Sequence, residues 1–313
     1  MAKYDASDLD LQIDPAQLKP LFKSQPHRHA GAILFNWLVI IGTAYFCTQY
    51  FNIVTYLLAV IIIGARMHAL AVLMHDAAHY RFLKNRKWND LITNVTTMYP
   101  LFLTIENYRK NHLAHHRHLN TEEDPDWVSK FGRREFTFPQ TKQDFLLTLG
   151  SYFLLYQGIR DAIWFVSRFD ILGQKKAKTN KKESKLPKLT FYVLLITGLT
   201  FFGGWTAFLF FWVIPYFSTF LMFQYIRSVA EHFGEQMEYD HLLNASRTVK
   251  TNPIEQFLVA PHNVGYHIGH HLYPGVPYYN LPKLHELLMK NADFKEKAHV
   301  TKGYFGGLLA ELG

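Results

Sequence analysis

The chain has 313 residues, of which 49% are hydrophobic and 16% aromatic, yet its mean hydropathy is close to zero. Long apolar stretches must therefore alternate with strongly polar ones, which is typical of membrane-spanning helices joined to aqueous segments. The formal charge of +8 comes without a nucleic-acid recognition motif, and the lysines cluster beside apolar runs, so a membrane surface is favoured over nucleic acid as a partner. The single cysteine, Cys47, excludes an intrachain disulfide, an iron-sulfur cluster and a zinc-thiolate site.

Within the N-terminal segment, residues 1–28, the first 20 residues are acidic and polar, with neither a basic n-region nor an early apolar core. We therefore expect no cleavable signal peptide. Residues 29–65 contain no Asp, Glu, Lys or Arg, and this stretch of 37 residues is too long for one ordinary helix across a hydrocarbon core of roughly 30 Å. It predicts a first transmembrane hairpin within residues 29–74, with an uncharged turn at residues 48–52.

A second charge-free stretch, residues 189–226, is broken near Gly203 and Gly204 and predicts a second hairpin, which gives four spans. Residues 174–188 carry seven lysines and one glutamate, whereas neither hairpin turn carries a charge. Because cytoplasmic loops are enriched in Lys and Arg, both termini and this loop are expected in the cytoplasm. The lysine run itself is interpreted as a solvated linker that also contacts anionic headgroups.

Residues 75–188 and 227–313 form the two large polar regions, and the whole chain, 1–313, is expected to form one membrane-embedded domain. Within the first region, residues 91–104 are apolar but interrupted. Residues 145–172 carry Arg160, Asp161 and Arg168 at helix-like spacing, which predicts an amphipathic helix lying in the membrane interface.

Eight of the seventeen histidines fall into three groups. His75 and His79 are four residues apart, so both can lie on one face of a helix. The other two groups share the pattern H-x-x-H-H and comprise His112, His115 and His116, and then His267, His270 and His271. This spacing predicts that the three imidazoles of each group converge on one face. Imidazoles gathered in this way repel one another when protonated, and ligation of iron or zinc removes that conflict.

The remaining histidines are interpreted more simply. His68 returns to the face of His75 and is expected to form a hydrogen bond within the helix packing. His118 and His262 are displaced from the ligand faces, and His285 needs only a packing role. Carboxylates near the three groups are candidate acceptors for the ring N–H groups of metal ligands, and these are Asp76, Glu106, Asp124 and Glu231.

The three histidine boxes, in this order and with a hydrophobic hairpin between the second and third, resemble those of the membrane-bound fatty acid desaturase and hydroxylase superfamily. The resemblance runs from about residue 31 to residue 284. It implies an all-α integral membrane fold, with four transmembrane helices in two hairpins and a cytoplasmic helical cap that holds a His-rich di-metal site. It also implies a ninth ligand just after the last span, where this chain has His232. Some acyl desaturases have an asparagine four residues earlier that holds a metal-bound water, but this chain has Ser228; Asn263 is either a substitute or a helix N-cap.

The resemblance further implies two iron ions as cofactor, dioxygen as co-substrate and a lipid or acyl chain as substrate. The electron donor must be a separate protein, such as a ferredoxin or a b-type cytochrome, because the chain has no haem, flavin or iron-sulfur motif. We therefore expect an oxygen-dependent fatty acyl desaturase whose only catalytic side chains are metal ligands. The alternative within this chemistry is a hydroxylase or ketolase that acts on a carotenoid, sterol, alkane or fatty acid. A metal-binding membrane transporter is a third interpretation, although transport sites usually lie at mid-bilayer rather than beyond the span ends.

Overall fold

The computed structural model describes residues 11, 13–168, 184–234, 237 and 243–312, and these residues are almost entirely helical. The N-terminal half contains α1 (Pro15–Leu18), η2 (Lys19–Phe22), α2 (Pro26–Gln49), α3 (Ile53–Ala78), α4 (Arg86–Thr93), η3 (Asn94–Met98), α5 (Ile105–His118), α6 (Pro125–Val128), η4 (Arg134–Phe136), α7 (Lys142–Phe153) and α8 (Tyr156–Arg168). The C-terminal half contains α9 (Leu186–Phe201), α10 (Trp205–Phe208), η5 (Leu209–Val213), η6 (Tyr216–Phe220), α11 (Leu221–His232), β1 (Thr248–Lys250), α12 (Pro253–Leu258), η7 (Pro261–Asn263), α13 (His267–Leu272), η8 (Tyr278–Asn280), α14 (Leu281–Leu288), α15 (Ala292–Lys297), β2 (Val300–Lys302) and η9 (Gly303–Leu308).

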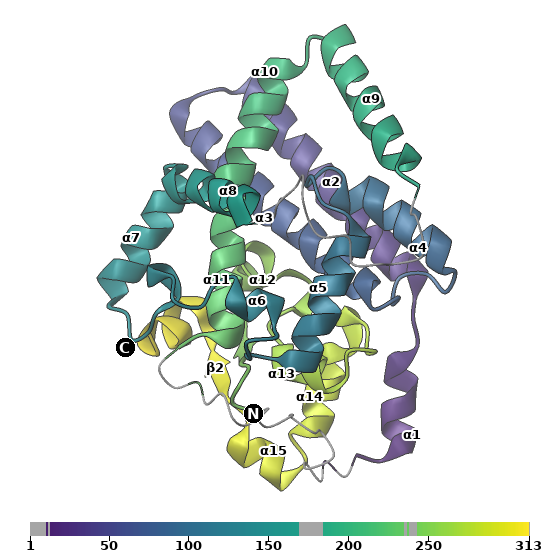
Figure 1. The fold of residues 1–313 in the computed structure, drawn as a ribbon, viewed down its shortest axis with the longest axis vertical. Helices are drawn as coiled ribbons and strands as arrows, with labels where there is room; N and C mark the ends of the chain where they lie inside the picture. Colours follow the sequence, from purple (N-terminus) through teal and green to yellow (C-terminus); the bar gives the residue numbers. More distant parts are fainter. Residues whose placement is uncertain (1–10, 12, 169–183, 235–236, 238–242, 313) are drawn as a thin grey trace.

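The first predicted hairpin is formed by α2 and α3, joined by a short turn. Asn52 ends this turn because its side chain accepts hydrogen bonds from the backbone N–H groups of Val54 and Thr55 and so caps α3. α3 is longer than its charge-free part and continues through Arg66 to Ala78. The first histidine box therefore begins inside this helix, rather than after it as expected. Since nearly every residue of α3 beyond Ile63 is buried, α3 forms the centre of the molecule (Figure 1).

The second charge-free stretch also folds into helices, and the break lies at the predicted place, where Gly203 adopts φ +64° between α9 and α10. Residues 205–232 form one long helix made of α10, η5, η6 and α11. Pro215 stands between the two π-helical segments η5 and η6, as expected where a proline ring displaces the regular hydrogen-bond ladder. Among the described residues, three helices are long and apolar enough to cross a membrane, α2, α3 and this one, while α9 is a shorter apolar helix.

The expected single amphipathic helix over residues 145–172 is wrong in one respect, because the segment is divided into α7 and α8. Leu155 adopts φ +67° between them, a left-handed conformation that no regular helix contains. Residues 169–172 lie outside the described part of the chain. The amphipathic character holds on both helices, since Leu146, Leu147 and Ile163 are exposed while Phe145 and Tyr152 are buried.

The polar segments gather at one end of the helices (Figure 1). There β1 pairs in parallel with β2, which joins the C-terminal segment to the chain that follows α11. α13 lies beside α5, where His270 contacts His116, and α14 packs against α13. This end holds all three histidine boxes. Most of the lysine run, residues 174–183, lies outside the described residues.

Candidate metal centre

The nine histidines named by the three boxes and by position 232 lie together in two groups of ring nitrogens. Within each group the nitrogen atoms lie within 4.8 Å of one another. The larger group is His75, His79, His112, His116 and His270, and the smaller group is His115, His232, His267 and His271. Residues more than 190 positions apart in the sequence are therefore neighbours at the ends of α3, α5, α11 and α13.

Each H-x-x-H-H box is split between the two groups, so the expectation that all three imidazoles converge together is wrong. On α5, His112 and His116 belong to the larger group and His115 to the smaller one. The helix explains this division, because residues i and i+4 lie about 40° apart around the axis while i+3 lies about 60° to the other side. α13 repeats the arrangement with the groups exchanged, so that each helix supplies both groups.

The distances within the groups fit two ligand spheres. In the larger group, Nε2 of His112 lies 2.8 Å from Nε2 of His79 and 3.0 Å from Nε2 of His116. In the smaller group, Nε2 of His267 lies 2.8 Å from Nε2 of His232 and 2.9 Å from Nε2 of His271. Two nitrogens that bind one ion at right angles, each about 2.1 Å away, lie about 3 Å apart. The donor atoms thus have the spacing of imidazoles that surround a metal ion.

Burial favours the neutral form of several histidines in these groups. Burial lowers the pKa of His79 from 6.5 to about 4. Burial, followed by the neighbouring imidazoles, also holds the pKa values of His112, His267, His270 and His271 well below 6.5. A neutral imidazole keeps a lone pair for a metal ion, so both groups can serve as ligands at neutral pH.

Two of the four candidate carboxylates lie behind these rings. Oδ2 of Asp124 lies 2.8 Å from Nδ1 of His115, and Asp124 is fully buried. Oε1 of Glu231 lies 3.5 Å from Nδ1 of His267 and accepts a hydrogen bond of 2.6 Å from Arg227. The bond to Asp124 fixes which ring nitrogen of His115 is free to bind a metal ion.

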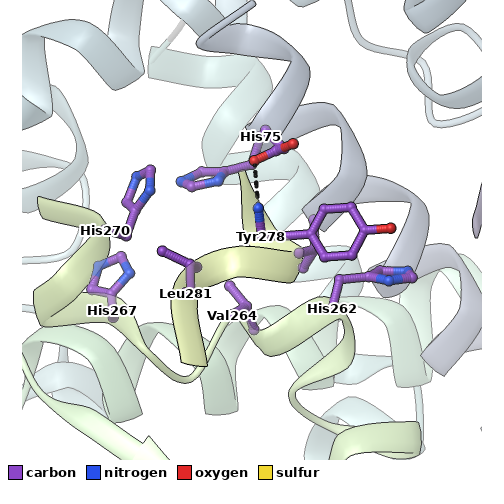
Figure 2. A pocket seen from close by; sticks show the side chains of 9 residues that line it. His75, His262, Val264, His267, His270, Tyr278 and Leu281 are labelled. Carbon is purple, nitrogen blue, oxygen red and sulfur yellow. Dashed lines mark hydrogen bonds between the residues drawn. The ribbon is translucent and has the colours of Figure 1, made fainter. Parts of the chain in front are cut away.

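The other two carboxylates are bonded elsewhere. Asp76 accepts the backbone N–H of Tyr278 at 3.1 Å, the bond drawn as a dashed line in Figure 2. Its second oxygen lies 3.5 Å from His29. Glu106 accepts from the side chain of Asn94. Adjacency in sequence was thus a poor guide, because Asp76 follows a box histidine directly yet bonds Tyr278 and lies beside His29. Asp76 instead borders a pocket of about 10 Å³ behind His75 and His270, which Figure 2 shows between α3 and α13.

The four other histidines singled out in the sequence belong to neither group. His68 contacts the backbone oxygen of Val259 at 3.0 Å, as expected for a packing role. His118 lies 2.8 Å from the exposed Glu123, and His262 lies 3.1 Å from the amide nitrogen of Asn36. His285 is buried against the ring of Tyr266.

A large cavity reaches the smaller group. Its volume is about 690 Å³, within the range of roughly 300–1,000 Å³ typical of ligand sites. His112, His115, His232 and His267 form part of its wall. Much of the remaining lining is apolar and comes from several elements: Ala71, Met74, Phe102, Leu103, Phe136, Tyr216, Phe217, Phe220 and Leu221. The arrangement therefore brings an apolar compound next to two candidate metal sites.

Comparison with known proteins identifies the family. The model of the fatty acid desaturase family matches residues 51–302. The chain belongs to the fatty acid desaturase family.

Named relatives agree with this assignment. The chain is 27% identical to dihydrorhizobitoxine desaturase of Bradyrhizobium elkanii, over 97% of this chain and 87% of the relative. It is 24% identical to the sn-1 oleoyl-lipid 12-desaturase of Anabaena variabilis, over 88% of this chain and 82% of the relative. It is 23% identical to the sn-1 acyl-lipid omega-3 desaturase (ferredoxin) of Nostoc sp. (strain 36), over 81% of this chain and 73% of the relative. This fatty acid desaturase homologue is therefore an oxidoreductase.

The family pattern did not decide the roles of two residues, Ser228 and Asn263. Ser228 lies in the cavity wall with His232, and its buried hydroxyl has no hydrogen-bond partner among the described residues. Asn263 neither lines the cavity nor caps α13; it adopts φ +57° and donates to the backbone oxygen of Tyr278. Of the two, only Ser228 is near the candidate centre.

Sequence reasoning missed most of the cavity lining in this desaturase. Tyr108 and Asn111 precede box 2 and line the cavity together with His112 and His115. Their spacing, i, i+3, i+4 and i+7, marks one face of α5 and was a usable signal. No sequence pattern distinguishes the phenylalanines that line the cavity, because most residues of membrane spans are apolar.

Proposed function

We propose that this protein is a multi-pass membrane enzyme that desaturates the acyl chain of a lipid. It uses two iron ions held by the nine histidines, dioxygen as co-substrate and an external electron donor. In this proposal the chain forms one domain over residues 1–313. The observation that carries the proposal is the contact between the four-histidine group and the apolar cavity.

The site's residues fit two ions. Five imidazoles surround one position and four surround the other, and the spacing of their Nε2 atoms supports both. Iron at these positions would supply the oxidation, in which dioxygen, two electrons and two protons remove two hydrogens from adjacent carbons and two molecules of water form. Every donor in the two groups is an imidazole, and neither group contains a soft ligand. Imidazoles bind zinc as well as iron, so the donor set alone does not select the metal. We take iron from the chemistry of the family.

The protein's own contribution is placement. Asp124 orients His115 through the Nδ1 atom of the ring, and Glu231 lies 3.5 Å from Nδ1 of His267. The aromatic and aliphatic wall of the cavity binds the acyl chain and excludes water from the reacting carbons. Because the four-histidine group lines the cavity and has one imidazole fewer than the other, a bound chain can approach it closely.

The names of the relatives support a lipid substrate and desaturation over hydroxylation. Two of the three relatives described above are named acyl-lipid desaturases, and one is named for ferredoxin. A ferredoxin is therefore the electron donor that we favour here. A transporter is disfavoured by the family assignment, since that family consists of enzymes.

We also propose four spans and a cytoplasmic metal centre. α9 is the fourth span in this proposal, although its 16 residues extend only about 24 Å. It has no buried residue, and its exposed side chains include Leu189, Leu194 and Phe201, which suits contact with lipid. The excess of lysine in residues 174–188 supports the cytoplasmic side.

The direct test is lipid analysis of cells that express the protein together with a ferredoxin and its reductase. We expect fatty acids with one additional double bond, and none in matched cells that express His271→Ala. Fatty acids that gain an oxygen atom would indicate a hydroxylase instead. Unchanged lipids, despite a metal-loaded protein in the membrane, would contradict the proposal.

A further inference from the structure

The turn that connects η3 to α5 contributes to the cavity wall. Phe102 and Leu103 from this turn line the cavity. Phe102 is also 46% exposed, whereas most other large apolar residues of the lining are less accessible. Its ring is therefore an accessible part of the wall.

Phe102 is held in an unusual backbone conformation. Its φ of +61° lies in the left-handed region, which a bulky residue seldom adopts. Residues in such conformations persist when their surroundings hold them, and they concentrate at binding and switch sites. The conformation therefore calls for contacts that hold this turn in place.

Those contacts come from the second hairpin. Three successive backbone carbonyls of the turn accept hydrogen bonds from three aromatic side chains: Tyr99 from Tyr192 at 3.0 Å, Pro100 from Trp212 at 2.9 Å, and Leu101 from Tyr216 at 3.2 Å. Backbone groups within a bilayer have no water to bind, so irregular backbone there needs partners of this kind. The turn is thus attached to α9, η5 and η6, the elements proposed to lie in the membrane.

The ring of Phe102 lies between two tyrosines of that hairpin. It stacks on Tyr192 of α9, with centroids 6.2 Å apart, and meets Tyr216 edge to face at 5.7 Å. Tyr216 lines the cavity, whereas Tyr192 is not part of its lining. α9 leans away from the other helices in Figure 1 and buries none of its residues. Phe102 therefore stands between the cavity and the lipid-facing helix.

We propose that Phe102 is the residue that controls access of acyl chains from the bilayer to the cavity. The ring closes the opening between the turn and the second hairpin, and acyl chains pass when it moves away from Tyr192 and Tyr216. The inference rests on the proposed function, because it takes the cavity to be the place where an acyl chain binds. A smaller side chain at position 102 widens the opening, and a larger one narrows it.

Access can be measured without catalysis. In a Cys47→Ser background, Phe220→Cys places the only thiol at a buried position in the cavity wall. The rate of its alkylation is followed in vesicles with an apolar maleimide dissolved in the bilayer, and separately with a charged, water-soluble maleimide. Adding Phe102→Ala should speed labelling by the apolar reagent about tenfold, the effect expected from the loss of two aromatic contacts. The water-soluble reagent should show little change.

Two variants make the result specific. Phe46→Ala removes a phenylalanine of similar exposure from α2, away from the cavity, and should leave both rates unchanged. If Phe102→Ala does not accumulate in the membrane, Phe102→Gly replaces it, because glycine adopts φ +61° without strain. Equal apolar labelling in the position-102 and position-46 variants would overturn the proposal, as would acceleration by the water-soluble reagent alone. Since labelling needs neither metal nor turnover, these outcomes are independent of whether the protein desaturates lipids.

Discussion

Asp124 and His115 form a buried pair, with Oδ2 of the carboxylate 2.8 Å from Nδ1 of the ring. The same oxygen accepts the backbone N–H of Asn120, and the other oxygen accepts that of Asp126. The carboxylate is therefore held in place by the backbone, and it directs the opposite ring nitrogen of His115 toward the four-histidine group. This is the clearest link between the peptide backbone and the candidate metal centre.

Asp124→Asn should weaken metal binding by about 10–100-fold, because the amide cannot supply the same two acceptor oxygens or the negative charge. Metal retention against a graded series of chelator concentrations measures the effect. Glu123→Gln is the matched control, since Glu123 is exposed and contacts only His118 among the nearby rings. Equal retention in the two variants would mean that Asp124 does not support the site.

Replacing any one of the eight box histidines by Ala should abolish activity while the protein still inserts in the membrane. Insertion depends on the apolar spans, whereas activity depends on the ligands. The residues are His75, His79, His112, His115, His116, His267, His270 and His271. Lipid analysis and the amount of protein in washed membranes are the two measurements. Near-normal activity in two or more of these variants would contradict the di-metal assignment.

Both termini and the lysine-rich loop are expected in the cytoplasm. Single cysteines in a Cys47→Ser background can test this by labelling from each side of the membrane. Ser184→Cys and Lys302→Cys should react from the cytoplasmic side, and Phe51→Cys and Phe202→Cys, at the two hairpin turns, from the other side. Labelling of position 184 from outside the cell would reverse the orientation.

His285 should make stability depend on pH. Burial, followed by the positive charge of Lys250, lowers its pKa to about 4, whereas an unfolded histidine has a pKa of about 6.5. Between these values the unfolded chain binds more protons than the folded one, so the free energy of unfolding falls as pH drops, by up to about 1.4 kcal/mol per pH unit. His285→Gln should flatten the dependence of the thermal midpoint on pH from 6.5 down to 4. His27 is exposed, and His27→Gln serves as the control that should behave as the parent. If the thermal midpoint of the His285→Gln variant depends on pH as steeply as that of the parent, the prediction is wrong.

The sequence was sufficient to locate the helical hairpins and the eight box histidines that lie together in the structure, because charge-free length and i, i+3, i+4 spacing are local properties. His232 came only from the family resemblance. The sequence was insufficient to predict how the histidines of each box are divided between the two groups of ring nitrogens. The angle between His112 and His115 follows from the helix, but which rings face each of them depends on how α3, α11 and α13 pack against α5. The break at Leu155 was equally hidden, because neither glycine nor proline marks it. Conversely, Pro215 marks a possible break where the helix continues through π-helical turns.

The carboxylates show the same limit. Four were near the boxes in sequence, and only Asp124 and Glu231 contact ligand rings in space. The turn before Phe102 and the three aromatic side chains that bond it were beyond prediction. They come from segments roughly a hundred residues apart and join through backbone carbonyls, which leave no trace in sequence.

The most direct test of the account is the metal content of the His232→Ala variant. His232 lies outside every box, yet its Nε2 lies 2.8 Å from that of His267, and its Nδ1 lies 3.3 Å from the backbone oxygen of Ala245, which orients the ring. If it completes the four-histidine site, the purified parent should carry two metal ions per chain and the variant should approach one, with loss of oxidation. His118→Ala, which removes a histidine outside both groups, should keep both ions. Equal metal content in the two variants, or a full complement in the His232 variant, would contradict the two-site assignment.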